Sequence, residues 1–200
     1  MIDFFAKFIS FIFNPYFLLL PIPYLLVVRE TGDPIYALKW TFLSLFFVFV
    51  VILFVLYAIR KGYFSDLDVS KREQRFLWFL FVGIVGVFYL LSLIFFEGPV
   101  VLWIVAAGIL FSVVVFSILN LRIKASLHVA AISSLIFAMS ILYGGVFLLL
   151  LFLIPLIGWS RIRIKRHTLY ETIVGAITGI AITLLFYIIF KVMMGISVSL

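Results

Sequence analysis

Long apolar segments separated by short polar ones make up nearly the whole chain of 200 residues. A helix needs about 20 apolar residues to cross a bilayer, so this pattern can be converted into candidate spans. The first segment contains Asn14 and three prolines, which predicts an interfacial helix followed by a short or kinked span. The predicted apolar segments are 4–28, 36–59, 76–96, 100–119, 127–143, 146–159 and 170–194.

The apolar residues in these segments are consecutive rather than alternating, as in the run from Leu45 to Ile59. A transmembrane barrel would alternate apolar and polar residues with a period of two. In lipid every backbone N–H and C=O must bond within the protein, which makes these runs helices. We therefore predict an all-α, polytopic transmembrane helix bundle of six to seven spans, with residues 1–200 forming a single transmembrane domain.

The composition supports this class, since 67% of the residues are hydrophobic and only 12% are charged. A soluble domain of this size could not cover that much apolar surface. The chain has no cysteine, which excludes disulfides and thiolate metal sites. Asn14 and Pro15 interrupt the first apolar run and no small-residue cleavage site follows, so a cleavable signal peptide is not expected.

The net charge of +7 is concentrated on one side of the predicted membrane. If the spans alternate, the N-terminus and the loops 60–75, 121–126 and 160–167 share one face, which we call face A. Face A carries twelve Lys and Arg residues against three on the opposite face, so the positive-inside rule predicts a cytoplasmic face A. Basic loops of this kind bind headgroups, so we expect the bilayer and a lipid as partners and no nucleic acid. The twelve residues are Lys7, Arg60, Lys61, Lys71, Arg72, Arg75, Arg122, Lys124, Arg161, Arg163, Lys165 and Arg166.

The residues able to perform chemistry also gather on face A. Both histidines, His128 and His167, lie at face-A ends of predicted helices. A spacing of four predicts that His167 and Glu171 share one face of a helix, where the carboxylate can hold the imidazole and fix its tautomer. Arg161 precedes them by one short loop and can bind two oxygens of a phosphate at once. Ionisable groups at a membrane boundary are candidates for a functional site.

The segment that contains these residues reads SRIRIKRHTLYE, from Ser160 to Glu171. It resembles the third signature of the type 2 phosphatidic acid phosphatase (lipid phosphate phosphatase) superfamily, SRxxxxxHxxxD, and Gly175 and Gly179 resemble the small-residue helix that follows it. The segment ASLH, which ends at His128, resembles the second signature, PSGH. The segment DLDVSKREQR lies where the family has KxxxxxxRP, before a span. The phosphatase-like core would cover about residues 36–195.

The chain departs from the family pattern at several positions. Glu171 replaces the aspartate of the third signature, and Ala125 and Leu127 replace the proline and glycine of the second. The basic cluster from Lys71 to Arg75 is shorter than the first signature and no proline follows it.

The resemblance implies a metal-independent hydrolase that needs no cofactor. His167 would attack phosphorus and form a phosphohistidine, His128 would protonate the leaving alkoxide, and Glu171 would orient His167. The substrate would be a lipid phosphate: a polyprenyl phosphate or diphosphate, a phosphatidate or a phosphatidylglycerophosphate. The residues implied to bind its phosphate are Arg72, Arg75, Arg161, Lys71 and Ser126.

Two other functions fit the sequence. The pair Asp66 and Asp68 is similar to the aspartate-rich motif of intramembrane prenyltransferases, in which Mg²⁺ bridges a diphosphate. In that case the protein would be a metal-dependent prenyl-diphosphate transferase. It could also be a non-catalytic lipid-binding protein. Asp66 and Asp68 could equally pair with nearby Lys and Arg or cap the next helix, and the histidines and arginines could be interfacial or orientation charges.

Overall fold

The computed structural model describes residues 2–193, which form helices joined by turns and contain no strand. The predicted all-α polytopic bundle is confirmed. The chain divides into two compact units, one of residues 19–122 and one that joins the N-terminal 18 residues to the chain from residue 123 onward. Residues 194 and 195 of the predicted phosphatase-like core lie outside the described residues.

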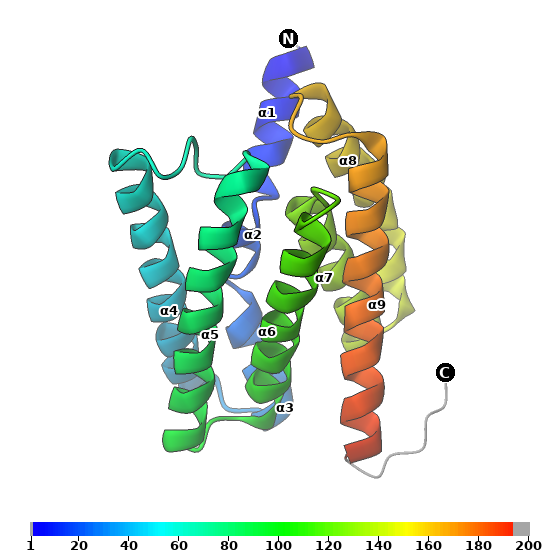
Figure 1. The fold of residues 1–200 in the computed structure, drawn as a ribbon. Helices are drawn as coiled ribbons and strands as arrows, with labels where there is room; N and C mark the ends of the chain where they lie inside the picture. Colours follow the sequence, from blue (N-terminus) through cyan, green and yellow to red (C-terminus); the bar gives the residue numbers. More distant parts are fainter. Residues whose placement is uncertain (1, 194–200) are drawn as a thin grey trace. The chain divides into compact units, whose positions relative to one another are not determined.

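The unit of residues 19–122 is built around a helical hairpin packed beside two other helices (Figure 1). The first two helices meet at a sharp corner, where Gly32 has a left-handed φ of 69° and the carboxylate of Asp33 accepts hydrogen bonds from Ile35 N and Tyr36 N. This is glycine after a helix and an N-cap before the next one, with Pro34 in the first turn. Its elements are α3 (Ile22–Thr31), α4 (Pro34–Arg60), η1 (Arg72–Gln74), α5 (Arg75–Phe95) and α6 (Val100–Asn120).

The other unit is held together by the close packing of two helices, α7 and α9. A Cβ at Gly175 would lie 2.5 Å from the carbonyl oxygen of Ser126, and one at Gly179 would meet the carbonyl of Ala130. Two glycines one turn apart thus let two helices approach backbone to backbone. The elements of this unit are α1 (Ile2–Ile12), α2 (Pro15–Leu18), α7 (Leu127–Tyr143), η2 (Gly145–Phe152), α8 (Leu153–Arg163) and α9 (Leu169–Met193); the glycines belong to α9 and their partners to α7 and its N-cap.

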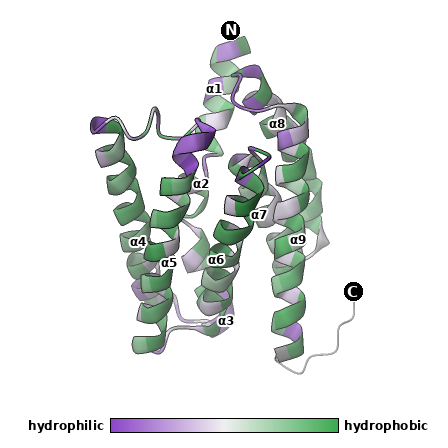
Figure 2. Ribbon diagram, viewed as in Figure 1, coloured by the Kyte–Doolittle hydropathy of each residue, from purple (hydrophilic) through white to green (hydrophobic). Residues whose placement is uncertain are grey.

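Length and hydropathy identify the helices that can cross a membrane. Among the described residues, five helical segments are each long and apolar enough to cross a membrane. A sixth span results if the bent pair 2–12 and 15–31 counts as one. At 17 residues, α7 is shorter, about 26 Å by its rise. Figure 2 shows α4, α5, α6 and α9 as mostly hydrophobic, with polar residues at the start of α5. These apolar helices fit an integral membrane protein.

The segment from Gly145 to Arg163 is long enough to cross a membrane with only 19 residues because part of it is stretched. Its first half, η2, is a 3₁₀ helix of 8 residues, which rises about 2 Å per residue instead of 1.5 Å. With the 11 residues of α8 the segment reaches about 32 Å, enough for a hydrocarbon core of about 30 Å.

Two expectations about the end of this segment are wrong. The predicted basic loop 160–167 begins four residues too early, since α8 continues to Arg163 and includes Ser160 and Arg161. His167 is not on a helix either, because α9 begins at Leu169. The physical reason is that α8 ends in a turn whose left-handed position is Lys165 instead of glycine, so the sequence does not mark where the helix ends.

Candidate functional site

The C-terminus of α8 folds back so that His167 returns to Arg161. The carbonyl oxygen of Arg161 accepts hydrogen bonds from Arg166 N at 3.0 Å and His167 N at 3.3 Å, while Lys165 N donates to the carbonyl of Ile162. The bonds from Arg166 N and Lys165 N form a Schellman motif, and Lys165 occupies its left-handed position with a φ of 57°. The turn explains how Arg161 and His167, six residues apart, are brought together.

The hydrogen bonds of the His167 ring define its tautomer. Its Nδ1 lies 3.0 Å from the carbonyl oxygen of Lys124 and 3.2 Å from Oε2 of Glu171. Both partners only accept hydrogen bonds, so Nδ1 carries the proton and Nε2 carries the lone pair of the neutral ring. The contact with Glu171 agrees with the predicted pairing, although it is made by a residue that precedes the helix.

Glu171 has a second, structural task that the sequence analysis missed. Its Oε2 accepts a hydrogen bond from Thr168 N at 2.9 Å, and its own N–H donates to the Thr168 hydroxyl at 3.3 Å. These reciprocal bonds form a capping box at the start of α9. The sequence Thr-x-x-Glu before an apolar run is the signal for it. A glutamate rather than an aspartate at position 171 therefore has a local reason.

Arg161 connects the histidine of α7 to the N-terminal helix. Its Nη1 donates to the hydroxyl of Ser10 at 2.6 Å and lies 3.5 Å from Nε2 of His128. Arg161 is 1% exposed and both histidines are under 10% exposed, so the charge lies inside the protein. Burial of a guanidinium is costly unless polar groups surround it, which makes this cluster a candidate for function.

The contact with Arg161 constrains the protonation of His128. A guanidinium can only donate, so the His128 ring presents the lone pair of Nε2 to it. To protonate a leaving group, His128 must take a proton at Nε2 after Arg161 turns away, or use Nδ1. The resemblance alone did not predict this.

Ser126 is the N-cap residue of α7, but its side chain makes no capping bond. The residue is 0% exposed, and its hydroxyl has no hydrogen-bond partner among the described residues. Its backbone N–H donates to the carbonyl of Glu171 at 3.0 Å, which ties the start of α7 to the start of α9. A buried hydroxyl of this kind beside a helix N-terminus is suited to an anion, because both are hydrogen-bond donors.

The aspartates of the loop between α4 and α5 organise that loop. Oδ1 of Asp66 accepts from the N–H of Asp68 at 3.0 Å and from the hydroxyl of Ser70 at 2.8 Å, and Oδ2 accepts from the hydroxyl of Ser65 at 3.0 Å. This is an aspartate-centred turn. Within residues 2–193 no group of three or more His, Asp or Glu side chains is placed to hold a metal ion.

The arginines of the same loop bond to nearby carbonyl groups. Arg75 is 3% exposed and its Nε donates to the carbonyl of Val69 at 3.2 Å. Nε of Arg72 donates to the carbonyl of Asn120 at 2.6 Å, and Nδ2 of Asn120 donates back to the carbonyl of Arg72. Lys71, the N-cap residue of η1, is exposed. These three predicted ligands belong to the unit of residues 19–122.

The predicted residues of the other unit form one connected network, which we call the His/Arg network. Side-chain contacts join His128 to Arg161 and His167 to Glu171. Backbone bonds join Arg161 to His167 and Ser126 to Glu171. The sequence analysis missed three contributors: the Ser10 hydroxyl, the Lys124 carbonyl and Thr168. Only Thr168 had a sequence signal, its capping box. Comparison with family models, curated proteins and solved structures finds no match.

Proposed function

We propose that the protein is an integral membrane phosphatase that hydrolyses the phosphate of a lipid at the His/Arg network. The observation that carries the proposal is the bonding of His167, whose Nδ1 faces a carbonyl and a carboxylate. This arrangement leaves the lone pair on Nε2, and Glu171 can stabilise the charge that the ring gains when Nε2 attacks phosphorus. The resemblance of the third signature supports the same role.

The chemical step would proceed in two stages. Nε2 of His167 attacks phosphorus, the bond between phosphorus and the lipid oxygen breaks, and the alkoxide takes a proton from His128. Water then gives a proton to His128 as it attacks the phosphohistidine, which releases inorganic phosphate and restores both imidazoles. Negative charge on the phosphate oxygens would be stabilised by the Arg161 guanidinium and the Ser126 hydroxyl.

A phosphate entering the network must compete with contacts that already exist. The longest of them joins Arg161 to His128, at the 3.5 Å limit of a hydrogen bond. An anion between these two side chains would replace the long contact of the guanidinium with a neutral ring by hydrogen bonds between opposite charges, which can be bidentate. It would also free Nε2 of His128 to hold the proton that the leaving group needs.

The loops of face A are proposed to lie in the cytoplasm, because twelve basic residues stand on that face against three on the other. A site at this boundary suits a substrate with a charged head and an apolar tail.

The test is phosphate release from long-chain phosphatidate, polyprenyl phosphate and phosphatidylglycerophosphate in EDTA. Wild type should release phosphate from at least one of them, and His167→Ala should lower the rate by about 10³-fold or more, as expected for loss of a nucleophile. Arg163→Ala is the matched control, since this exposed arginine pairs with Asp3 at 2.8 Å outside the network. Equal rates for wild type and His167→Ala, or loss of activity in EDTA, would contradict the proposal.

Non-catalytic lipid binding is the second candidate. The 2.6 Å bond from Arg161 to Ser10 favours it, because this bond holds the arginine of the network inside the fold instead of leaving it for a reacting phosphate. Lipid binding by wild type without any phosphate release would select it. The transferase alternative would instead require magnesium dependence and inactivity of Asp68→Asn.

A further inference from the structure

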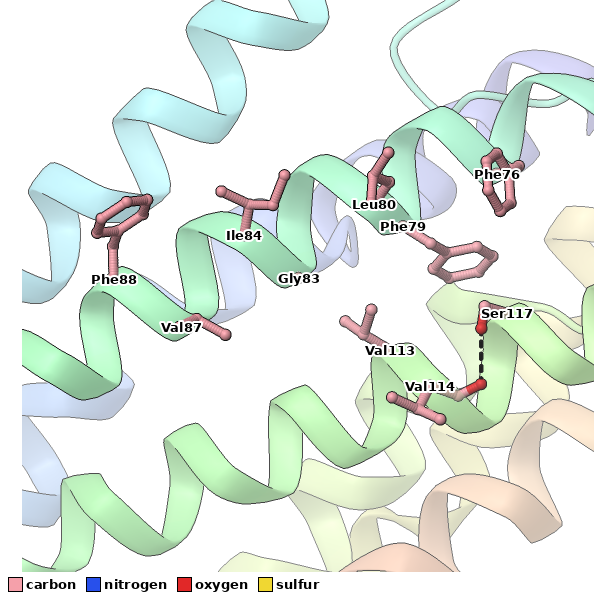
Figure 3. A pocket seen from close by; sticks show the side chains of 10 residues that line it. All are labelled: Phe76, Phe79, Leu80, Gly83, Ile84, Val87, Phe88, Val113, Val114 and Ser117. Atoms are coloured by element: carbon pink, nitrogen blue, oxygen red, sulfur yellow. Dashed lines mark hydrogen bonds between the residues drawn. The ribbon is translucent and has the colours of Figure 1, made fainter.

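An apolar groove runs between α5 and α6, in the unit of residues 19–122 (Figure 3). Its volume is about 430 Å³, and it extends along α5 from Phe76 to Phe88. Figure 3 shows the side chains of both helices along it and Gly83 on α5. Both helices are candidate membrane spans, and six of the ten residues that line the groove are exposed.

Two glycines of α5 lie where this helix meets α6 beside the groove. At Gly86 the helices touch, since an added Cβ would lie 2.7 Å from Cδ2 of Leu110. At Gly83 they have separated, and an added Cβ would meet only Cγ1 of Val113 at an ordinary 3.7 Å. Gly83 itself lines the groove, so a larger residue at position 83 would project into it.

One end of the groove reaches a basic cluster. Arg72 precedes Phe76 by one turn, and Ser117 of α6 lines the groove one turn before Asn120. The bonds between Arg72 and Asn120 tie the two helix ends together there. Lys71 and Arg122 are exposed beside this end and Glu73 opposes them, which leaves an excess of positive charge. Arg72 uses one of its five N–H donors for Asn120, so other N–H groups of its planar guanidinium can donate to a phosphate.

We propose that this groove binds one acyl or isoprenoid chain of an anionic lipid, whose phosphate is held by Arg72 with Lys71 and Arg122. The apolar walls provide chain contact without selectivity, and the basic end selects a negatively charged headgroup over a zwitterionic one. The site goes beyond the proposed phosphatase, because the bound lipid need not be hydrolysed.

The test is native mass spectrometry of the full chain, released from detergent with equal amounts of dioleoyl phosphatidylglycerol and dioleoyl phosphatidylcholine. Wild type should retain phosphatidylglycerol preferentially. Gly83→Phe should lower its retention about tenfold by filling the groove, and the double variant Lys71→Gln/Arg122→Gln should remove the preference while chain binding persists. Leu91→Phe is the matched control, because Leu91 is an exposed residue of α5 that does not line the groove. It should behave as wild type.

Val114→Phe, on the exposed wall of the groove, repeats the test if Gly83→Phe does not fold. Three results would overturn the proposal: equal retention of the two lipids by wild type, equal behaviour of the groove variants and Leu91→Phe, or loss of a dimer without any change in lipid retention, which would make the groove a contact between copies of the chain. None of these readouts depends on phosphate release, so failure of the proposed phosphatase activity leaves this test intact.

Discussion

The loops that follow α4 and α8 begin with the same turn, but the residue at its end has apolar surroundings in one loop and polar partners in the other. After α4 the carbonyl of Ala58 accepts from Tyr63 N and Phe64 N, and after α8 the carbonyl of Arg161 accepts from Arg166 N and His167 N. Phe64 and His167 therefore occupy equivalent positions. Phe64 is 2% exposed and packs in an apolar cluster, whereas the His167 ring bonds to polar groups.

The difference between these loops shows which polar residues are used for folding. In the α4–α5 loop, the polar side chains of Asp66 and Arg75 bond to backbone and side chains of the same loop. In the α8–α9 loop and its neighbours, the side chains come from α1, α7, α8 and the start of α9 and bond to one another. Stabilising a loop does not require a histidine facing an arginine from another helix, so the second arrangement is the better candidate for a site.

Among the tests of this comparison, the largest effect is expected from removing the arginine that joins the helices. Arg161→Ala should lower kcat/KM for a lipid phosphate by about 10²- to 10³-fold, the usual loss when one donor to a charged transition state is removed. Arg163→Ala, two residues away on the same helix and exposed, should change it less than threefold. Rates measured under identical detergent conditions decide between them. Similar losses in both variants would mean that Arg161 only supports the fold.

The next prediction compares two carboxylates, Glu171 and Asp66, each of which accepts hydrogen bonds that organise a loop. Glu171→Gln keeps the capping box, which accepts Gln as well as Glu, but removes the charge that faces the imidazole. Phosphate release should fall about 10- to 100-fold with little change in melting temperature. Asp66→Asn should behave in the opposite way and lower stability by about 1 kcal/mol through weaker loop bonds, with activity retained. Loss of activity in Asp66→Asn together with a magnesium requirement would contradict this prediction and place the site at the α4–α5 loop.

The smallest effect tests the shared turn itself. Lys165 and Gly62 both occupy the left-handed position of the turn, with φ values of 57° and 78°. Lys165→Gly should raise the free energy of unfolding by about 1 kcal/mol by removing Cβ strain, and Gly62→Lys should lower it by a similar amount. Space does not interfere at Gly62, since an added Cβ meets nothing within 4 Å. Denaturant titrations in detergent measure both, and changes of the same sign would show that the turns are not equivalent.

Hydropathy alone predicted the helices, because a run of apolar residues in lipid has one favourable conformation. The end of α8 was mispredicted because its turn has Lys165 where the signal is usually glycine, whereas Gly62 marks the same turn after α4. Thr168 and Glu171 carried a readable capping signal. Ser10 carried none, since its bond to Arg161 joins positions 151 residues apart and depends on packing that local sequence does not encode.

The central claim is that Nε2 of His167 attacks phosphorus, and trapping the intermediate tests it most directly. The full chain would be mixed with a lipid carrying ³²P in its phosphate, denatured in base within milliseconds, digested, and the labelled peptide sequenced. We predict an acid-labile, base-stable label on the peptide that contains His167, absent from His167→Ala and unchanged in Arg163→Ala. Phosphate release by wild type with no label on His167, or with the label on another residue, would contradict the account.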